Sequence, residues 1–303
     1  MKSRPFLPLG ASLGLLALLL SGCGSTATDP SGSDQSSSSG GQLNQQLHDA
    51  LPEEVRSSKT LDAVMIPFAP YVIEEEDGKT VKGASIEVAE VLSGILGVTV
   101  KTEIVPAFSG AVTGIQSGRY DFGLGPYADN ATTRENFTFV DWIQEFVVFL
   151  VPKGNPAGIA GLSTACGHTV AVLAGGSAES VVKKASAACP KPIEVRSFED
   201  ANAAILAVQS GRADGYFSSR ASLVYYKEKS GGAFELAGEG EANGFENLRQ
   251  GSFFAKDSKL TEVVLKAFEE LQATGKLGEI MAKWGLAENE VEKVGLDLAA
   301  VAK

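Results

Sequence analysis

The chain has 303 residues, 44% of them hydrophobic, which is long and apolar enough for two domains of ordinary size. Its 37 acidic residues outnumber its 26 basic ones and give a formal net charge of -11. Because nucleic acid and anionic lipid are bound through basic surfaces, this balance argues against nucleic acid as a partner and disfavours docking on a membrane through a basic patch.

Residues 1–22 have the organisation of a secretory signal, a basic start followed by an apolar run too short for a transmembrane helix. The run ends in Leu20-Ser21-Gly22-Cys23, which resembles the bacterial lipobox, where the cysteine is acylated and becomes the first residue of the mature protein. We therefore expect Cys23 to carry a lipid. Residues 23–42 are rich in Ser and Gly and should form a flexible tether.

A first α/β region follows a short leading helix expected in residues 43–58. Ser85 should cap a helix that Gly97 ends, and an Asp77-Gly78 turn indicates a hairpin. The other expected elements are strands at residues 63–66 and 98–104 and a helix that begins at Phe108. Strands that alternate with helices in this way are the α/β pattern.

One hexapeptide occurs twice, as QSGRYD at residues 116–121 and as QSGRAD at residues 209–214. Each copy closes an apolar, helix-like run and opens a short strand. Its Gly supplies a left-handed cap, and its Arg suits the negative end of the helix dipole. Two copies of one helix–turn–strand unit predict two α/β lobes built alike. Ligands bind beyond the carboxyl ends of such strands, so residues 125–127 and 218–220 should face each other across a cleft.

Between the two copies, residues 126–136 should form an irregular loop and residues 146–151 a strand that crosses to the second lobe. In that lobe Ser177 should cap one helix and Ser197 another. Further elements are expected at residues 169–173, 193–196, 221–229, 252–255, 258–273 and 276–284. Residues 286–303 have only weak helical periodicity. We expect residues 43–150 with 248–303 to form lobe 1 and residues 151–247 to form lobe 2.

Cys166 and Cys189 flank one strand–helix unit of the second lobe, and an exported chain meets an oxidising compartment. The two can form a disulfide if the end of the helix folds back beside the start of the strand. A metal site of Cys166, His168 and Cys189 is the alternative. The sequence has no CxxC spacing, so we expect neither a metal nor a cofactor.

From about residue 61 to residue 285 the chain resembles the polar-amino-acid class of extracellular solute-binding proteins of bacterial ABC transporters. The matching pieces include Pro67-Phe68-Ala69-Pro70-Tyr71, both hexapeptides, Gly175-Gly176-Ser177 and Lys283-Trp284-Gly285. The resemblance implies two Rossmann-like lobes joined by two crossing strands, a cleft that closes on one small molecule, and permease and ATPase subunits as partners. The lipobox, tether and cysteine pair resemble lipid-anchored members, held at the outer face of the cytoplasmic membrane.

The resemblance also implies that the ligand stacks on aromatic rings of the first lobe. Phe68 and Phe108 are the matching positions, and Tyr127 and Trp142 would add to the wall. A ring face suits an apolar side chain or a cation.

In this family the carboxylate of the ligand is held by an arginine and by backbone amides. Arg134, whose guanidinium can grip a carboxylate bidentately, and the main chain from Gly125 to Tyr127 are the candidates. The helix start at Gly176 and Ser177 offers a second anion site through its free N–H groups.

Two positions depart from the family pattern. Arg134 lies one residue later than the arginine of the family, whose place is taken by Thr133. Amino-acid binders place an Asp for the α-ammonium where this chain has Ser219. Either another acid, such as Asp141 or Glu179, substitutes, or the ligand is not a standard α-amino acid. An amine or a quaternary ammonium compound is the alternative ligand.

The sequence therefore predicts a monomeric, lipid-anchored capture protein of an ABC importer, without chemistry of its own. Its first-choice ligand is an amino acid or an amino-acid-like compound. A dehydratase or lyase on the same fold would need an acid or base in the cleft, for which Glu87, Asp141 and Glu145 are the candidates. A receptor sensor lobe would need a transmembrane segment after the lobes, and residues 286–303 contain none.

Overall fold

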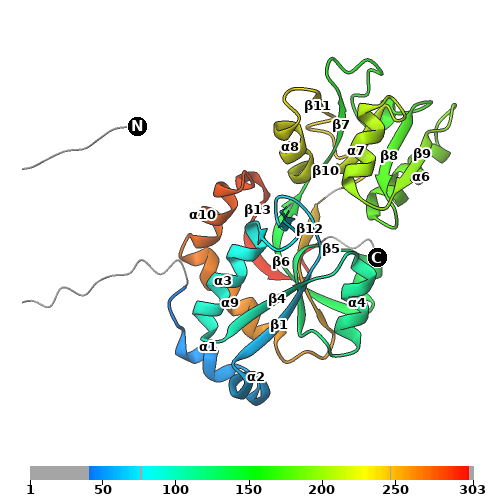
Figure 1. The fold of residues 1–303 in the computed structure, drawn as a ribbon. Helices are drawn as coiled ribbons and strands as arrows, with labels where there is room; N and C mark the ends of the chain where they lie inside the picture. Colours follow the sequence, from blue (N-terminus) through cyan, green and yellow to red (C-terminus); the bar gives the residue numbers. More distant parts are fainter. Residues whose placement is uncertain (1–40, 76, 246, 300–303) are drawn as a thin grey trace, which may run out of the picture. The chain divides into compact units, whose positions relative to one another are not determined.

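The computed structural model describes residues 41–75, 77–245 and 247–299. The predicted signal segment, Cys23 and the tether up to residue 40 lie outside these ranges. The described chain forms two mixed α/β lobes, each built on its own sheet (Figure 1). Within this part of the chain, no helix combines the length and the apolar character needed to cross a membrane.

The first sheet has six strands in the order β13-β6-β12-β5-β1-β4. They are β1 (Thr60–Met65), β4 (Thr99–Ile104), β5 (Phe122–Asp129), β6 (Phe137–Glu145), β12 (Leu248–Ala255) and β13 (Glu290–Leu296). β1, β4 and β5 run parallel, whereas β12 is antiparallel to both β5 and β6. Apolar residues of α3 (Ala84–Leu96) and α9 (Thr261–Ala273) pack in one core, and those of α4 (Phe108–Gln116) pack in another.

The second sheet has five strands in the order β11-β7-β10-β8-β9. They are β7 (Val147–Pro152), β8 (Thr169–Leu173), β9 (Glu194–Phe198), β10 (Gly215–Ser219) and β11 (Phe234–Ala237). One core contains residues of α6 (Ser177–Ala187), and a second contains residues of α7 (Ala201–Gln209) and α8 (Arg220–Lys229). The remaining elements are α1 (Gln45–Ala50), α2 (Glu53–Ser58), β2 (Ile73–Glu74), β3 (Val81–Lys82), α5 (Ala131–Arg134), η1 (Leu162–Thr164), α10 (Lys276–Lys283) and η2 (Ala287–Asn289).

The two copies of the repeated hexapeptide have the same local structure. Gly118 and Gly211 both follow a helix with φ of 71°, in the left-handed region. The Asp121 carboxylate accepts a 2.7 Å hydrogen bond from the first part of β1, and the Asp214 carboxylate accepts one of 2.8 Å from the first residue of β8. Each copy thus ties a helix end to a neighbouring parallel strand, and the predicted pair of similar lobes is confirmed.

The chain passes between the sheets twice. Phe146 joins β6 of the first sheet to β7 of the second, and the segment after β11 returns to β12. Both crossings agree with the expected two-lobe fold. The predicted lobe boundaries stay a prediction; the second sheet already includes β7, which begins at Val147.

Two segments have more regular structure than the sequence predicts. The expected irregular loop at residues 126–136 is instead the end of β5 followed by α5, which Asn130 caps by accepting bonds from two backbone N–H groups. The expected weak helix after residue 286 contains β13, an edge strand beside β6. Pairing with β13 covers N–H and C=O groups along one side of β6.

Several helix starts also differ from expectation. Pro52 divides the single leading helix into α1 and α2. Ser85 lies within the first turn of α3, and Ser177 is the first residue of α6, so neither provides a side-chain cap. Asp200, and not Ser197, caps α7, because its carboxylate accepts a 2.9 Å bond from the Ala203 N–H.

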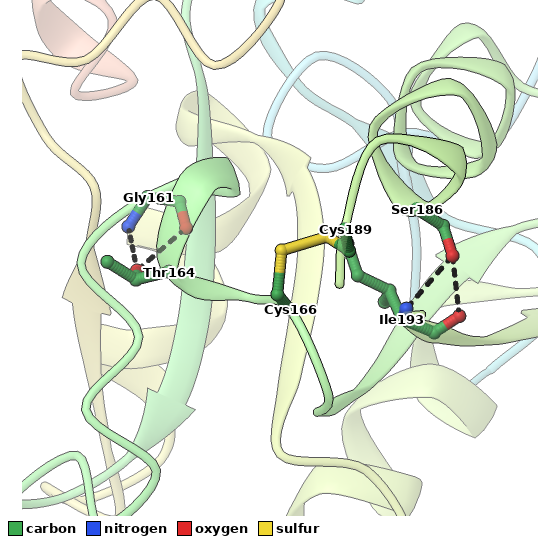
Figure 2. Close-up of a disulfide and its surroundings, with 6 residues drawn as sticks. All are labelled: Gly161, Thr164, Cys166, Ser186, Cys189 and Ile193. Carbon is green, nitrogen blue, oxygen red and sulfur yellow. Dashed lines mark hydrogen bonds between the residues drawn. A yellow bond between two sulfur atoms is a disulfide. The ribbon is translucent and has the colours of Figure 1, made fainter. Parts of the chain in front are cut away.

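Cys166 and Cys189 form a disulfide, with their Cα atoms 5.5 Å apart (Figure 2). The end of α6 folds back toward β9, because the Ser186 hydroxyl bonds both the N–H and the carbonyl of Ile193 (Figure 2). The predicted bridge is therefore present. Because both sulfur atoms are in the disulfide, neither can act as a thiolate ligand in the alternative metal site with His168.

Candidate ligand-binding site

Segments of both lobes meet beside Phe68. The loop after β1 carries Phe68 and Ala69, and the Ala69 carbonyl accepts a hydrogen bond from the Ser222 hydroxyl in α8. The Ser219 hydroxyl, immediately before α8, donates a 2.6 Å hydrogen bond to Oε2 of Glu145, the last residue of β6. The first loop of lobe 1, the β6–β7 crossing and the β10–α8 junction therefore lie together.

The aromatic side chains named from the sequence separate into accessible and buried rings. Phe68 is only partly buried, and Phe108 is 36% exposed at the first position of α4. Tyr127 is 3% exposed and its hydroxyl donates to the Val64 carbonyl, while Trp142 is fully buried and stacks on Phe268 with ring centroids 5.6 Å apart. Phe68 and Phe108 thus offer ring surface to a ligand, and the rings of Tyr127 and Trp142 belong to the core.

Phe146 is an accessible ring that the sequence does not single out. It is 44% exposed and lies on the first crossing between the lobes, directly after Glu145. The face of an exposed aromatic ring suits an apolar side chain or a cationic group.

Gly125 lies within β5 with φ of 153°, a conformation that favours glycine. A Cβ at this position would be 3.5 Å from the Tyr127 ring and 3.9 Å from Oγ of Ser85. The backbone at Gly125 is therefore next to the first turn of α3, at the carboxyl edge of the parallel strands where ligands bind in this architecture.

Arg134 already holds a carboxylate of the chain itself. Its Nε and Nη2 donate to the two oxygens of Asp129, which is 2% exposed. The hydrogen bonds to Asp129 raise the pKa of Arg134 above its usual value. Asp129 comes five residues before Arg134, across the single turn of α5, so the pair is local in sequence although the sequence analysis did not identify it.

The acids around Arg134 also bind the C-terminal segment. Asp141 accepts a 2.7 Å bond from the Leu298 N–H, and Asp129 accepts one of 3.1 Å from the Ala299 N–H. Asp297 accepts a bond from the Phe139 N–H, and its Oδ1 is 3.9 Å from Nε of Arg134. Burial, and then the neighbouring Asp129 carboxylate, raise the pKa of Asp141 well above its usual range. Asp141, a sequence candidate for ammonium binding, is engaged here within the protein.

The start of α6, predicted as a second anion site, also contains an acid of the chain. The Gly175 N–H donates a 2.7 Å bond to Oε2 of Glu179. The Glu179 carboxylate further accepts bonds of 2.6 Å from Lys183 and from Ser197. These bonds, that from Lys183 first, lower the pKa of Glu179 to about 2. Gly176 is the N-cap residue and Ser177 is exposed, as the first residue of the helix.

Glu145 supplies the carboxylate nearest to Ser219. It is 3% exposed, and its Oε1 accepts bonds of 2.9 Å from the Phe146 N–H and 3.1 Å from the Asn289 amide. Burial raises the pKa of Glu145 to about 7, and the donors, Ser219 first, oppose that rise. No local signal places Glu145 beside Ser219, because 74 residues separate the two.

A separate hollow of about 450 Å³ lies between α3 and α10. Glu87 lines it and accepts hydrogen bonds from Lys283 and from the Trp284 indole. None of the predicted ligand-binding residues lines this hollow. Glu87, which the sequence offers as an acid or base of an enzyme, is thus hydrogen-bonded within the protein at the hollow between α3 and α10.

This arrangement of two α/β lobes joined by two crossing segments is that of a solute-binding protein. The chain belongs to the bacterial extracellular solute-binding proteins, family 3, whose family model matches residues 63–287. It is 30% identical over 232 residues to the arginine-binding protein ArgT of Corynebacterium glutamicum. The alignment covers 75% of this chain and 74% of that protein. It is 27% identical over 232 residues to the probable amino-acid-binding protein YxeM of Bacillus subtilis. That alignment covers 75% of this chain and 83% of the relative.

A solved structure of an ancestral arginine-binding protein bound to arginine matches with a TM-score of 0.66 at 27% identity, covering 75% of this chain and 98% of that one. The predicted family and fold are confirmed. The protein is an exported solute-binding protein of the ABC-transporter class and not an enzyme. Proteins of this class bind a small molecule and deliver it to the permease.

Proposed function

We propose that this protein is a monomeric, lipid-anchored receptor that captures an amino acid or an amino-acid-like compound for an ABC importer. One observation carries the proposal: two hydrogen bonds join the lobes at their crossing, from Ser219 to Glu145 and from Ser222 to the carbonyl of Ala69, the residue after Phe68. The similarity to one arginine-binding protein and one probable amino-acid-binding protein supports this ligand class.

In the proposed mechanism the ligand lies against the rings of Phe68 and Phe108 in lobe 1. The main chain from Gly125 to Tyr127 completes this side of the site. From lobe 2 the ligand would meet the start of α6 at Gly176 and Ser177, and the end of β10 at Ser219. Contacts from both lobes favour the closed arrangement over the open one, so that ligand binding and lobe closure are coupled.

An amine or a quaternary ammonium compound is the second candidate ligand. The exposed Phe146 ring on the crossing favours it, because a ring face attracts a cation. Such a ligand would use the same two lobes and the same permease.

The membrane attachment is proposed from the sequence. Leu20-Ser21-Gly22-Cys23 provides the acylation motif, and residues 24–42 provide the tether to the folded part. A permease and an ATPase on the same membrane complete the importer.

The direct test is a thermal-shift screen of the folded part with amino acids, amines and osmolytes. A ligand of the native state raises the unfolding temperature by mass action, by an amount that grows with its concentration. We expect basic amino acids or their close relatives to give the largest shift. A broad panel without any shift would contradict the capture function.

A further inference from the structure

Four consecutive residues at the start of α8 connect the second lobe to the first. Among residues 41–75, 77–245 and 247–299, every hydrogen bond and ion pair between the two lobes has its lobe 2 end at residues 219–222. Apart from the two crossing segments, the polar connection between the lobes is therefore concentrated in one helical turn.

The first part of this turn binds the crossing. The Ser219 hydroxyl donates to Glu145, and the Arg220 N–H donates a 2.7 Å bond to the Phe146 carbonyl. Burial raises the pKa of Glu145, and the Ala221 N–H is among the donors that oppose this rise. Ser219 is the N-cap residue of α8 but makes no side-chain capping bond, so an acid of lobe 1 takes that place.

The last part of the turn reaches the loop after β1. The Ser222 hydroxyl donates to the carbonyl of Ala69, the residue after Phe68, and Ser222 is only 4% exposed. Ala221 packs in the main apolar core of lobe 1, although α8 otherwise contributes to a core of lobe 2. The start of α8 is therefore held by lobe 1 through apolar as well as polar contacts.

Arg220 adds an ion pair between the lobes. It is the first residue of α8, where the positive end of the helix dipole disfavours a cation. Two acids offset this cost: Nε is 3.0 Å from Oε1 of Glu239 in lobe 2, and Nη1 is 3.1 Å from Oε2 of Glu288 in the C-terminal segment of lobe 1. One guanidinium thus has a partner within its own lobe and a partner across the lobes.

We propose that residues 219–222 are a non-covalent pivot of lobe closure, and that Ser222 is a positioning residue that fixes lobe 2 relative to the loop carrying Phe68. Two crossing segments alone leave the lobes free to twist and slide as well as to rotate. Contacts from one turn to several points of lobe 1 restrict that freedom, so fewer arrangements compete with the one that binds ligand. The inference goes beyond the proposed function, because no step in it depends on which ligand binds.

The test measures the distance between the lobes without any ligand. In the full chain with Cys23→Ser, the two remaining cysteines are joined in the disulfide. Spin labels therefore attach only to introduced cysteines, Leu206→Cys in α7 of lobe 2 and Glu262→Cys in α9 of lobe 1, both at exposed positions. Pulsed electron paramagnetic resonance then gives the distribution of distances between the two labels.

A double variant breaks two contacts of the pivot, and a second double variant is its matched control. Ser222→Ala with Glu288→Gln removes one hydrogen bond and one ion pair between the lobes, so the distance distribution should broaden. Ser230→Ala with Glu239→Gln removes a serine bond to a backbone carbonyl of α8 and the other ion pair of the same guanidinium, both inside lobe 2. The distribution of this control should match that of the chain without either change.

L-Arginine is the probe for the effect on binding, measured by titration calorimetry on the unlabelled proteins. A protein that spends less time in the binding-competent arrangement has a proportionally higher apparent dissociation constant. Loss of one hydrogen bond and one ion pair between the lobes should raise that constant by about tenfold. The control should stay within about twofold of the wild type.

The outcomes separate the pivot from the capture function. Equal distance distributions in the test and control variants overturn the pivot, whatever ligand binds. A broader distribution in the test variant alone, with weaker L-arginine binding, supports it. If neither L-arginine nor any compound of the thermal-shift panel binds the wild type, the proposed function fails and the distances still decide on the pivot. Should the test variant not fold, Glu288→Gln alone, at a 73% exposed side chain, is compared with Glu239→Gln and should give the broader distribution.

Discussion

The Ser219 hydroxyl donates a 2.6 Å hydrogen bond to the buried carboxylate of Glu145. Ser219 ends β10 of the second sheet, and Glu145 ends β6 of the first. The other carboxylate oxygen accepts bonds from Phe146 and from Asn289, the residue immediately before β13. One carboxylate thus connects the second lobe, the crossing and the C-terminal segment, and the crossing is organised around a polar group.

This environment makes stability depend on the protonation of Glu145. Its pKa is about 7 in the folded protein and near its ordinary value of 4.5 when unfolded. The folded state therefore binds the proton more tightly, and the stability gained from Glu145 is full below about pH 4.5 and lost as the pH rises through 7. The shift corresponds to about 3 kcal/mol. Relative to Glu145→Gln, the wild-type free energy of unfolding should fall by about this amount between pH 4.5 and pH 8.

Urea unfolding of both proteins at several pH values measures this difference. Glu228→Gln, an exposed acid in α8, serves as the control and should follow the wild type at every pH. Parallel stability curves for the wild type and Glu145→Gln would mean that Glu145 does not titrate in this range.

Phe68→Ala should weaken ligand binding with a small effect on folding. The Phe68 ring is only partly buried, and the loop that carries it is also held by main-chain bonds and by the Ser222 hydroxyl. Loss of a stacking surface should raise the dissociation constant by about tenfold or more for the ligand found in the screen. Leu206→Ala, at a 54% exposed position of α7, is the control and should bind normally. Equal affinity in all three proteins would remove Phe68 from the site.

Cys23→Ser should release the protein from the cell. The prediction rests on the sequence, because Cys23 lies outside the residues that the structure describes. Without the acylated sulfur, the folded part has only its acidic surface to present to the membrane, and it should appear in the culture medium. Fractionation with an antibody measures this, and Ser25→Ala should leave the protein on the membrane. Retention of Cys23→Ser in the membrane fraction would refute the lipid anchor.

Features encoded by short-range chemistry could be predicted from the sequence. The two hexapeptides predict two helix–turn–strand units because the left-handed glycine and the following aspartate act within a few residues. The Asp77-Gly78 turn predicts the β2–β3 hairpin for the same reason, and the spacing of Cys166 and Cys189 about one strand–helix unit predicts their bridge.

Features set by distant partners could not be predicted. The last strand, β13, has too little alternation to be recognised alone and forms because β6 offers it an edge. Ser219 and Glu145 are brought together by two sheets, and the sequence gives no measure of that distance. Arg134 has the right chemistry for a ligand carboxylate, but which carboxylate it meets depends on how α5 turns back toward Asp129.

Replacing the aspartate of either hexapeptide should destabilise the protein to a similar extent. Asp121 and Asp214 each accept a bond from the backbone N–H of a parallel strand, and both also donate their own N–H to that strand. Asp121→Ala and Asp214→Ala should each lower the free energy of unfolding by about 1–2 kcal/mol, because a backbone donor loses its partner. Asp121→Asn retains an acceptor and should lose less. Denaturant unfolding measures all three, and a neutral Ala variant would contradict the equivalence of the two units.

Removal of the disulfide should lower stability through the unfolded chain. Cys166 and Cys189 are 23 residues apart, and a loop of this size constrains the unfolded state by about 3 kcal/mol. The double variant Cys166→Ser with Cys189→Ser should therefore unfold at a lower temperature than the oxidised wild type. Dithiothreitol should lower the wild-type transition toward that of the variant and leave the variant unchanged. A wild-type transition that matches the variant with and without reductant would show that the bridge contributes no stability.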